Sequence, residues 1–119
     1  MQRLRRRADF LNAATGSKAP AAPFVLQAVK RGEDGSARIG FTVSKKVGTA
    51  VERNRVRRRL REIVKQSTAP MRLGYDYVLV GRRAALAEPF DRMVTTFDAA
   101  VRRVHAASAR RPALPAARE

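Results

Sequence analysis

The sequence predicts an α+β domain, or the related α/β sandwich, in which helices pack on a small sheet. The length of 119 residues fits one domain, and a hydrophobic content of 45% is enough to build a core. Segments with the period of strands and of helices follow in the order helix, strand, strand, helix, strand, helix. We expect a single domain over residues 1–107 and a flexible tail over 108–119, which is rich in Ala, Arg and Pro.

The first half of the chain predicts one short helix and two strands. Residues 8–14 fit two helical turns, and two prolines make 17–23 a predicted loop. A compact apolar run predicts a strand over 24–29, and alternating apolar and polar residues predict another over 37–43. An Asp-Gly step between these strands is a turn signal, so we expect them to form a hairpin.

The strongest helix signal in the sequence covers residues 49–67. Thr49 is a suitable N-cap, and Glu52 three residues later completes a capping box. At about 100° per residue, the apolar side chains form one stripe, with the basic side chains outside it: Val56, Leu60, Ile63 and Val64. An apolar run predicts an inner strand over 75–81, and a last helix is predicted over 90–106.

The charge is the unusual feature of the composition. The chain has 26 Lys and Arg against 10 Asp and Glu, which gives a net charge of +16 and a pI of about 11.8. Nucleic acid is therefore the first partner to expect, and an anionic membrane surface is the second. No apolar run approaches the ~20 residues that a membrane helix needs.

The N-terminal sequence and the cysteine count bear on the cellular location. The opening MQRLRRRADF lacks the apolar segment of a secretory signal. An Arg-rich organelle transit peptide is the alternative, but the next residues already have the pattern of a folded domain. The absence of cysteine excludes a disulfide framework. We expect a cytoplasmic protein.

Candidate catalytic residues are scarce. Without cysteine the chain has no thiolate nucleophile, and its single histidine, His105, is predicted to lie on the surface. The ten acidic residues are scattered. Glu52 is assigned as a helix cap, and Glu62 as an intrahelical partner of Arg58 or Arg59. We therefore expect neither catalytic nor metal-binding residues.

A dense basic segment lies between residues 45 and 65. It holds nine Lys and Arg residues against two acidic ones, and arginines four apart on a helix repel one another. Phosphate groups can offset this repulsion because guanidinium groups pair with them bidentately. RNA is modestly favoured over DNA, because no helix-turn-helix or zipper pattern accompanies the helix. Phe10 and Phe24 are candidates for stacking on bases.

The stretch RIGFTVSKKVGTAVERNRVRRRLREIVK, residues 38–65, resembles the signature of the bacterial ribonuclease P protein family. That family has a strand ending in Ser-Lys-Lys, then a glycine, then a helix that opens with Arg-Asn-Arg. The resemblance implies a two-layer α/β sandwich with a small mixed sheet and a left-handed βαβ crossover (ribosomal protein S5 domain 2-like). The usual preference for right-handed connections would have predicted the opposite hand.

The resemblance also implies an activity. The complex of this family removes the 5′ leader of precursor tRNA by Mg²⁺-dependent hydrolysis, and the catalytic groups and metal sites lie mainly in its RNA subunit. The implied partners are the catalytic RNA, in a 1:1 complex, and precursor tRNA with its leader. No membrane and no further protein partner are expected.

The family pattern assigns two sets of site residues. The candidate contacts to the RNA subunit are Lys45, Lys46, Arg53, Asn54, Arg55, Arg57, Arg58, Arg61 and Lys65. The candidate leader cleft, formed by the first helix and the open face of the sheet, comprises Phe10, Phe24, Gln27, Arg38, Gly40 and Thr42.

The sequence departs from the family pattern in the cleft, where Ala14 and Gln27 stand in place of common aromatic residues. The cleft is therefore expected to depend more on charge than on stacking. Two alternatives stay open: a structural RNA-binding protein, such as a ribosomal component, and a protein that is itself a nuclease.

Overall fold

The computed structural model describes residues 2–31 and 35–110, with side chains as far as residue 106. Five strands form one mixed sheet in the order β1-β4-β5-β3-β2. The strands are β1 (Gln2–Arg3), β2 (Ser17–Pro20), β3 (Phe24–Lys30), β4 (Arg38–Thr42) and β5 (Tyr75–Gly81). The helices are α1 (Arg7–Ala13), α2 (Ala50–Gln66) and α3 (Phe90–Arg110), with short 3₁₀ helices η1 (Lys45–Val47) and η2 (Arg83–Leu86).

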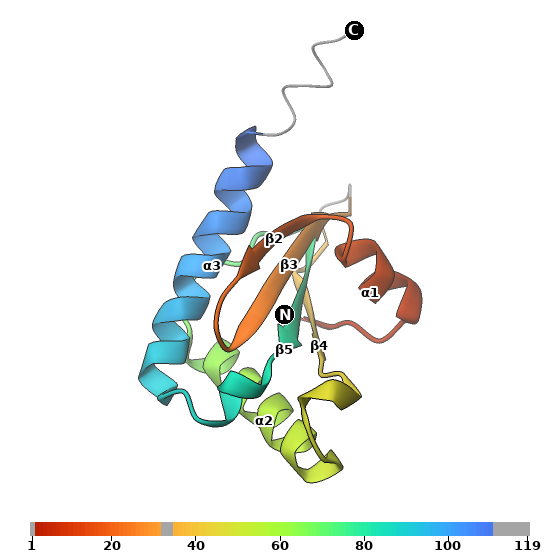
Figure 1. Ribbon diagram of the computed structural model, residues 1–119. Helices are drawn as coiled ribbons and strands as arrows, with labels where there is room; N and C mark the ends of the chain where they lie inside the picture. Colours follow the sequence, from red (N-terminus) through yellow and green to blue (C-terminus); the bar gives the residue numbers. More distant parts are fainter. Residues whose placement is uncertain (1, 32–34, 111–119) are drawn as a thin grey trace, which may run out of the picture.

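The two faces of the sheet are covered unequally. Helices α2 and α3 pack on one face and enclose the main core, whereas α1 lies on the opposite face (Figure 1). Only seven residues long, α1 covers part of its face, over a second and smaller core formed by Leu4, Ala13 and Val78. The described fold is thus the predicted mixed α+β sandwich, with one face of the sheet left partly open.

The unit β4–α2–β5 places the basic helix. Strands β4 and β5 are parallel neighbours, paired from Arg38 with Asp76 to Thr42 with Val80. Their connection runs through η1 and α2, so α2 is the crossover helix implied by the resemblance. The predicted capping box is confirmed: the Glu52 amide donates to Thr49 Oγ1 (3.2 Å), and the Thr49 amide donates to Glu52 Oε1 (2.9 Å).

The predicted hairpin between the strands over 24–29 and 37–43, which correspond to β3 and β4, is wrong. Strand β5 lies between β3 and β4, pairing antiparallel with β3 and parallel with β4. Its residues from Asp76 to Leu79 are buried, so β5 needs a neighbour on each side and takes the central position. The Asp-Gly turn signal falls partly on residues 32–34, which lie outside the described residues.

The predicted loop over 17–23 contains a strand. Residues 17–20 form β2, which pairs antiparallel with β3 at the edge of the sheet and buries Ala19. Pro20 is tolerated there because an edge strand does not need every amide as a donor. Strand β1, which pairs in parallel with β4, also escaped prediction because it has only two residues, both exposed.

The last helix is longer than predicted. Helix α3 continues to Arg110, four residues beyond the expected end at residue 106. It buries Met93, Phe97, Val101 and Val104 against the sheet, as its helical spacing predicts. The end of the predicted tail, residues 111–119, lies outside the described residues.

Candidate nucleic-acid interface

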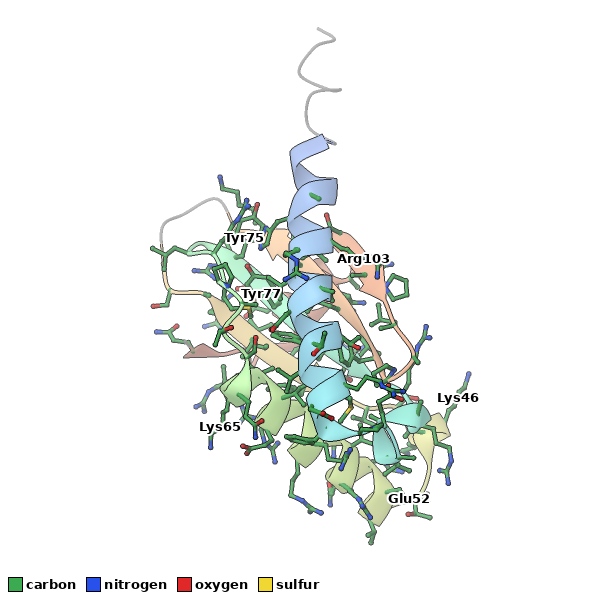
Figure 2. The ribbon with its side chains drawn as sticks, turned by 90° about the vertical axis from the view of Figure 1, so that its left-hand side faces the viewer. Lys46, Glu52, Lys65, Tyr75, Tyr77 and Arg103 are labelled. Atoms are coloured by element: carbon green, nitrogen blue, oxygen red, sulfur yellow. The ribbon has the colours of Figure 1, made fainter. Side chains whose placement is uncertain are left out.

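The nine residues predicted to face an RNA subunit all lie on η1 and α2, and we call them the basic helix surface. Each is exposed or half-buried, while Val56, Leu60 and Ile63 of α2 face the core. Figure 2 shows Lys46 and Lys65 at opposite ends of this surface. The structure thus brings the predicted set together: Lys45, Lys46, Arg53, Asn54, Arg55, Arg57, Arg58, Arg61 and Lys65.

Most cations of the basic helix surface have no partner among the residues that the structure describes. Two arginines do: Arg53 donates to the Gly48 carbonyl (2.9 Å), and Arg57 donates to Asn54 Oδ1 (2.9 Å). For the others, the described part of the chain offers neither a hydrogen bond nor an ion pair: Lys45, Lys46, Arg55, Arg58, Arg61 and Lys65. Their charges point to solvent and are available to an anionic ligand.

The predicted pairing of Glu62 with Arg58 or Arg59 is wrong. Glu62 instead accepts a hydrogen bond from Gln66 Nε2 (3.1 Å). Arg59 donates to the carbonyls of Ala85 (2.8 Å) and Glu88, with its guanidinium 5.3 Å from the centre of the Phe90 ring. These contacts tie α2 to η2 and α3, which gives Arg59 a structural role.

A second arginine, Arg83 of η2, fixes the start of α2. It donates to the Val47 carbonyl (2.8 Å) and forms an ion pair with Glu52 (Nη2–Oε2, 3.0 Å). Hydrogen bonds from Arg83 and from the Thr49 amide lower the pKa of Glu52 to about 2. A Cβ at Gly48 would lie 2.2 Å from Glu52 Oε1, so glycine leaves room for this pair.

Sequence reasoning did not identify Arg83. In the sequence it is one arginine of the pair that follows the third strand, and no spacing links it to Glu52, 31 residues earlier. The fold alone brings η2 beside the start of α2. The contacts of Arg83 link the two parts of the basic helix surface, η1 and α2.

A groove of about 460 Å³ lies between α1 and the open face of the sheet. It contains three of the predicted cleft residues, Phe10, Gln27 and Thr42, and also Ala14. The remaining lining residues had not been predicted, and they supply two cations and an apolar wall: Arg5, Arg7, Leu11, Phe41, Val78 and Val80. The groove can therefore hold both flat apolar rings and anionic groups.

Gly40 lies beneath Phe10 and not at the open surface. A Cβ at this position would lie 2.6 Å from two carbons of the Phe10 ring. Gly40 therefore allows α1 to sit close to β4 and positions Phe10. Gly40, predicted as a residue of the leader cleft, thus has a packing role beneath Phe10 and does not itself line the groove.

The structure places Phe24 outside the groove. Its side chain is 0% exposed, on the opposite face of the sheet, where its ring packs edge-on against Phe97 at 6.3 Å. Burying such a side chain contributes about 1.5–3 kcal/mol, and stacking on a base contributes about 1–3 kcal/mol. Moving Phe24 out of the core to stack on a base would bring no net gain.

Arg38 lies at the end of β4 furthest from η1 and is held by acids. It pairs bidentately with Asp76 (Nε–Oδ1 2.8 Å, Nη2–Oδ2 2.7 Å), and Arg31 also donates to Asp76 Oδ1 (2.7 Å). Burial would raise the pKa of Asp76, but the hydrogen bonds and charges of Arg38 and Arg31 outweigh it and lower this pKa. Arg38 therefore has a structural partner and does not line the groove.

His105 is buried, contrary to the prediction that it lies on the surface. It is 5% exposed, and its Nε2 lies 2.7 Å from the Tyr77 hydroxyl, which accepts a hydrogen bond from the Arg72 amide (2.8 Å). Figure 2 shows Tyr75 and Tyr77 beside α3, and the Tyr75 ring packs edge-on against His105 at 4.8 Å. Burial and the charge of Arg72 lower the pKa of His105 to about 4.

The described residues include no group of three or more His, Cys, Asp or Glu side chains able to hold a metal ion. Several acidic side chains have partners within the fold: Asp76 and Glu52 bind arginines, and Asp98 accepts from the Ser67 hydroxyl. Among the helices described, none is long and apolar enough to cross a membrane.

Comparison with known proteins identifies the family. A family model described as Ribonuclease P matches residues 1–105. The chain is 48% identical over 107 residues to the ribonuclease P protein component of Ruegeria pomeroyi, covering 87% of this chain and 86% of the relative. It is 47% identical over 112 residues to that of Paramagnetospirillum magneticum, covering 89% and 84%.

Solved structures agree with the sequence relatives. The RNase P protein from Thermotoga maritima superposes with a TM-score of 0.71 at 29% identity, covering 87% of this chain and 98% of that one. The RNase P protein of Staphylococcus aureus gives a TM-score of 0.68 at 27% identity, covering 86% and 94%. The chain therefore belongs to the ribonuclease P protein family.

Proposed function

We propose that this chain is the protein cofactor of a bacterial ribonuclease P. It binds the catalytic RNA subunit and the 5′ leader of precursor tRNA, and it promotes Mg²⁺-dependent endonucleolytic removal of the leader. The observation that carries the proposal is the pairing of two features in a member of this family. One is the basic helix surface, most of whose cations have no partner among the described residues, and the other is a basic and apolar groove on the open face of the sheet.

The basic helix surface is the proposed contact to the RNA subunit. Its guanidinium groups suit phosphate oxygens because each can donate two parallel hydrogen bonds. The junction of Arg83, Glu52 and Gly48 fixes η1 relative to α2, so the surface is ordered before RNA binds. Preordered cations lose less conformational entropy on binding, which favours affinity.

The groove is the proposed site of the single-stranded leader. Phe10 and Leu11 offer apolar surface to bases, and Arg5 and Arg7 offer charge to phosphates. Because Ala14 and Gln27 replace aromatic residues common in the family, stacking is expected to contribute less here and charge more. This balance predicts a leader affinity that depends strongly on salt.

The proposal assigns catalysis to the RNA subunit and gives the protein the task of binding. Mg²⁺ would be held mainly by RNA phosphates, and the fixed positive charge of the protein would help at low Mg²⁺ by reducing repulsion between crowded phosphates. The partners are one RNA subunit per protein chain and precursor tRNA, with no further protein and no membrane. The proposed location is the bacterial cytoplasm, where precursor tRNA is transcribed.

The test of the proposed RNA interface is the salt dependence of binding to a bacterial ribonuclease P RNA. Arg58→Ala removes an exposed cation that has no protein partner, so it should weaken binding and reduce the slope of log K against log salt by about 1. Arg102→Ala is the matched control, because Arg102 is an exposed arginine of α3. Its neighbour Arg103 lies away from α2 (Figure 2).

The control variant should keep both the affinity and the slope of the unmodified protein. If Arg58→Ala leaves both quantities unchanged, the basic helix surface does not contact the RNA subunit. If both variants lower the slope equally, the binding is a general effect of net charge and the proposed interface is wrong.

A further inference from the structure

A second hollow, of about 480 Å³, lies beside the groove and has a different chemistry. Its lining is almost entirely charged, with one amide and one acid among four arginines: Gln2, Arg3, Arg5, Arg6, Asp9 and Arg38. The groove, by contrast, has Phe10, Leu11 and two valines in its wall. A lining of guanidinium groups suits phosphate oxygens, and an apolar wall suits bases.

Two of these arginines are held in place by the protein. Arg38 is fixed by its bidentate pair with Asp76 and also lies 3.5 Å from Asp9. The Arg3 guanidinium lies 5.9 Å from the centre of the Phe41 ring. The exposed side chains of Arg5 and Arg6 complete the hollow. One acid among four arginines leaves an excess of positive charge for an anion.

The hollow and the groove are connected through Arg5, which lines both. Their order along β4 is fixed by the strand. Thr42 of the groove lies three residues before η1 and the basic helix surface, whereas Arg38 of the hollow is at the far end of the strand. At about 3.3 Å per residue, these two positions are about 13 Å apart.

We propose that this hollow is a second subsite for the 5′ leader, and that it takes the phosphodiester backbone of nucleotides upstream of those in the groove. The inference rests on the proposed function, because it requires the leader to occupy the groove. Followed from its cleavage site at the RNA subunit toward its 5′ end, the leader meets the Thr42 end of the groove first. It then passes Arg5 and reaches Arg6. Short leaders should fill the groove alone, and longer leaders should fill both.

Two neighbouring arginines provide a matched pair of variants. Arg6 lines the hollow but not the groove, and Arg7 lines the groove but not the hollow. Both side chains are exposed, without a protein partner among the described residues. Arg6→Gln and Arg7→Gln should therefore change the overall fold equally little, while each removes one cation from a different subsite.

The experiment measures the affinity of the reconstituted protein–RNA complex for precursor tRNAs whose leaders are lengthened one nucleotide at a time. We expect Arg7→Gln to weaken binding about two- to fivefold once the leader enters the groove. Arg6→Gln should cause a loss of similar size only at greater leader lengths. Leaderless tRNA should bind equally well to all three complexes.

The outcomes test the second subsite separately from the assignment of the groove as the leader site. If Arg7→Gln shows the dependence on leader length but Arg6→Gln has no effect, or the same effect at every length, the second subsite is wrong and the groove assignment stands. If neither variant shows any dependence on leader length, the proposed leader site itself is wrong.

Discussion

Arg58 and Arg59 are neighbours in the sequence, yet their guanidinium groups have different surroundings. Arg59 donates to two backbone carbonyls near α3, and Arg58 points to solvent with no partner in the described residues. Arg31, Arg38 and Arg83 likewise bind acids of the protein. The basic residues therefore divide into those that hold the fold together and those that are free for a ligand.

His105 shows how a buried residue limits the pH range of stability. The Tyr77 oxygen already accepts the Arg72 amide proton, so its hydroxyl proton is best placed to donate to Nε2 of a neutral His105 ring. A proton added to Nε2 would disturb this arrangement and place a charge in a buried site. The lowered pKa of about 4 follows from this burial and from the charge of Arg72.

The unfolding free energy is predicted to fall between pH 6.5 and pH 5. The pKa of His105 is lower in the folded state, about 4, than its ordinary value of 6.5, so the unfolded state binds more protons in this window. The stabilisation is complete above pH 6.5 and is lost as the pH falls, by about 1–2 kcal/mol at pH 5. Urea denaturation at a series of pH values measures it.

A His105→Gln variant is the comparison, because His105 is the single histidine of the chain. Glu52 and Asp76 also lose stabilisation in acid, but their pKa values lie below the ordinary carboxyl range, outside this window. The variant should therefore show a flat profile from pH 6.5 to pH 5. A decline as steep as that of the unmodified protein would show that His105 is not the cause.

At the scale of elements, the orientation of α2 depends on its contacts with η2. Arg83 binds the last residue of η1 and the first turn of α2, and Arg59 binds η2 from the middle of α2. These contacts join three elements that carry or support the basic helix surface. They also explain why Gly48 stands between η1 and α2, where a Cβ would clash with Glu52.

The Arg83→Gln variant should weaken binding to the RNA subunit about two- to fivefold without changing the salt slope. Arg83 orders the junction of η1 and α2 through Glu52 and the Val47 carbonyl, so its loss leaves every phosphate-binding cation in place. The measurement is a binding titration at several salt concentrations. A slope reduced by about 1 would mean that Arg83 itself contacts phosphate, contrary to this account.

Local signals predicted some elements well. The capping box and apolar stripe predicted α2, and the apolar run predicted β5 with its bounds of 75 and 81. Strand β2 and the true neighbours of β3 escaped prediction, because pairing partners depend on contacts between distant residues. An Asp-Gly step indicates a turn, but it does not say which strand will occupy the adjacent position in the sheet.

At the scale of the whole molecule, the candidate site shows the same difference between features set by nearby residues and features set by contacts between distant ones. The basic helix surface was predicted from the density of charge in one helix, because all of its residues are close in the sequence. The groove was predicted only in part, because it joins residues of α1, β3, β4 and β5. Phe24 shows the limit of prediction from residue type. Its aromatic ring suits stacking on a base, but the alternation of buried and partly exposed side chains along β3 places it in the core.

The net charge of the whole chain favours the binding of a polyanion at both the basic helix surface and the groove. A net charge of +16 on 119 residues opposes folding through self-repulsion and favours association with a polyanion. The two candidate RNA surfaces meet at the end of β4, where Thr42 lines the groove and Lys45 begins η1. A single RNA assembly can therefore contact the basic helix surface and deliver a single strand into the groove.

The most direct test of the proposed function is reconstitution. The protein is mixed with a bacterial ribonuclease P RNA and a precursor tRNA, and leader release is followed at low Mg²⁺ with each component omitted in turn. Release at low Mg²⁺ is expected to require both the RNA subunit and the protein. The proposed function is wrong if the protein gives no stimulation while the same RNA is active alone at high Mg²⁺.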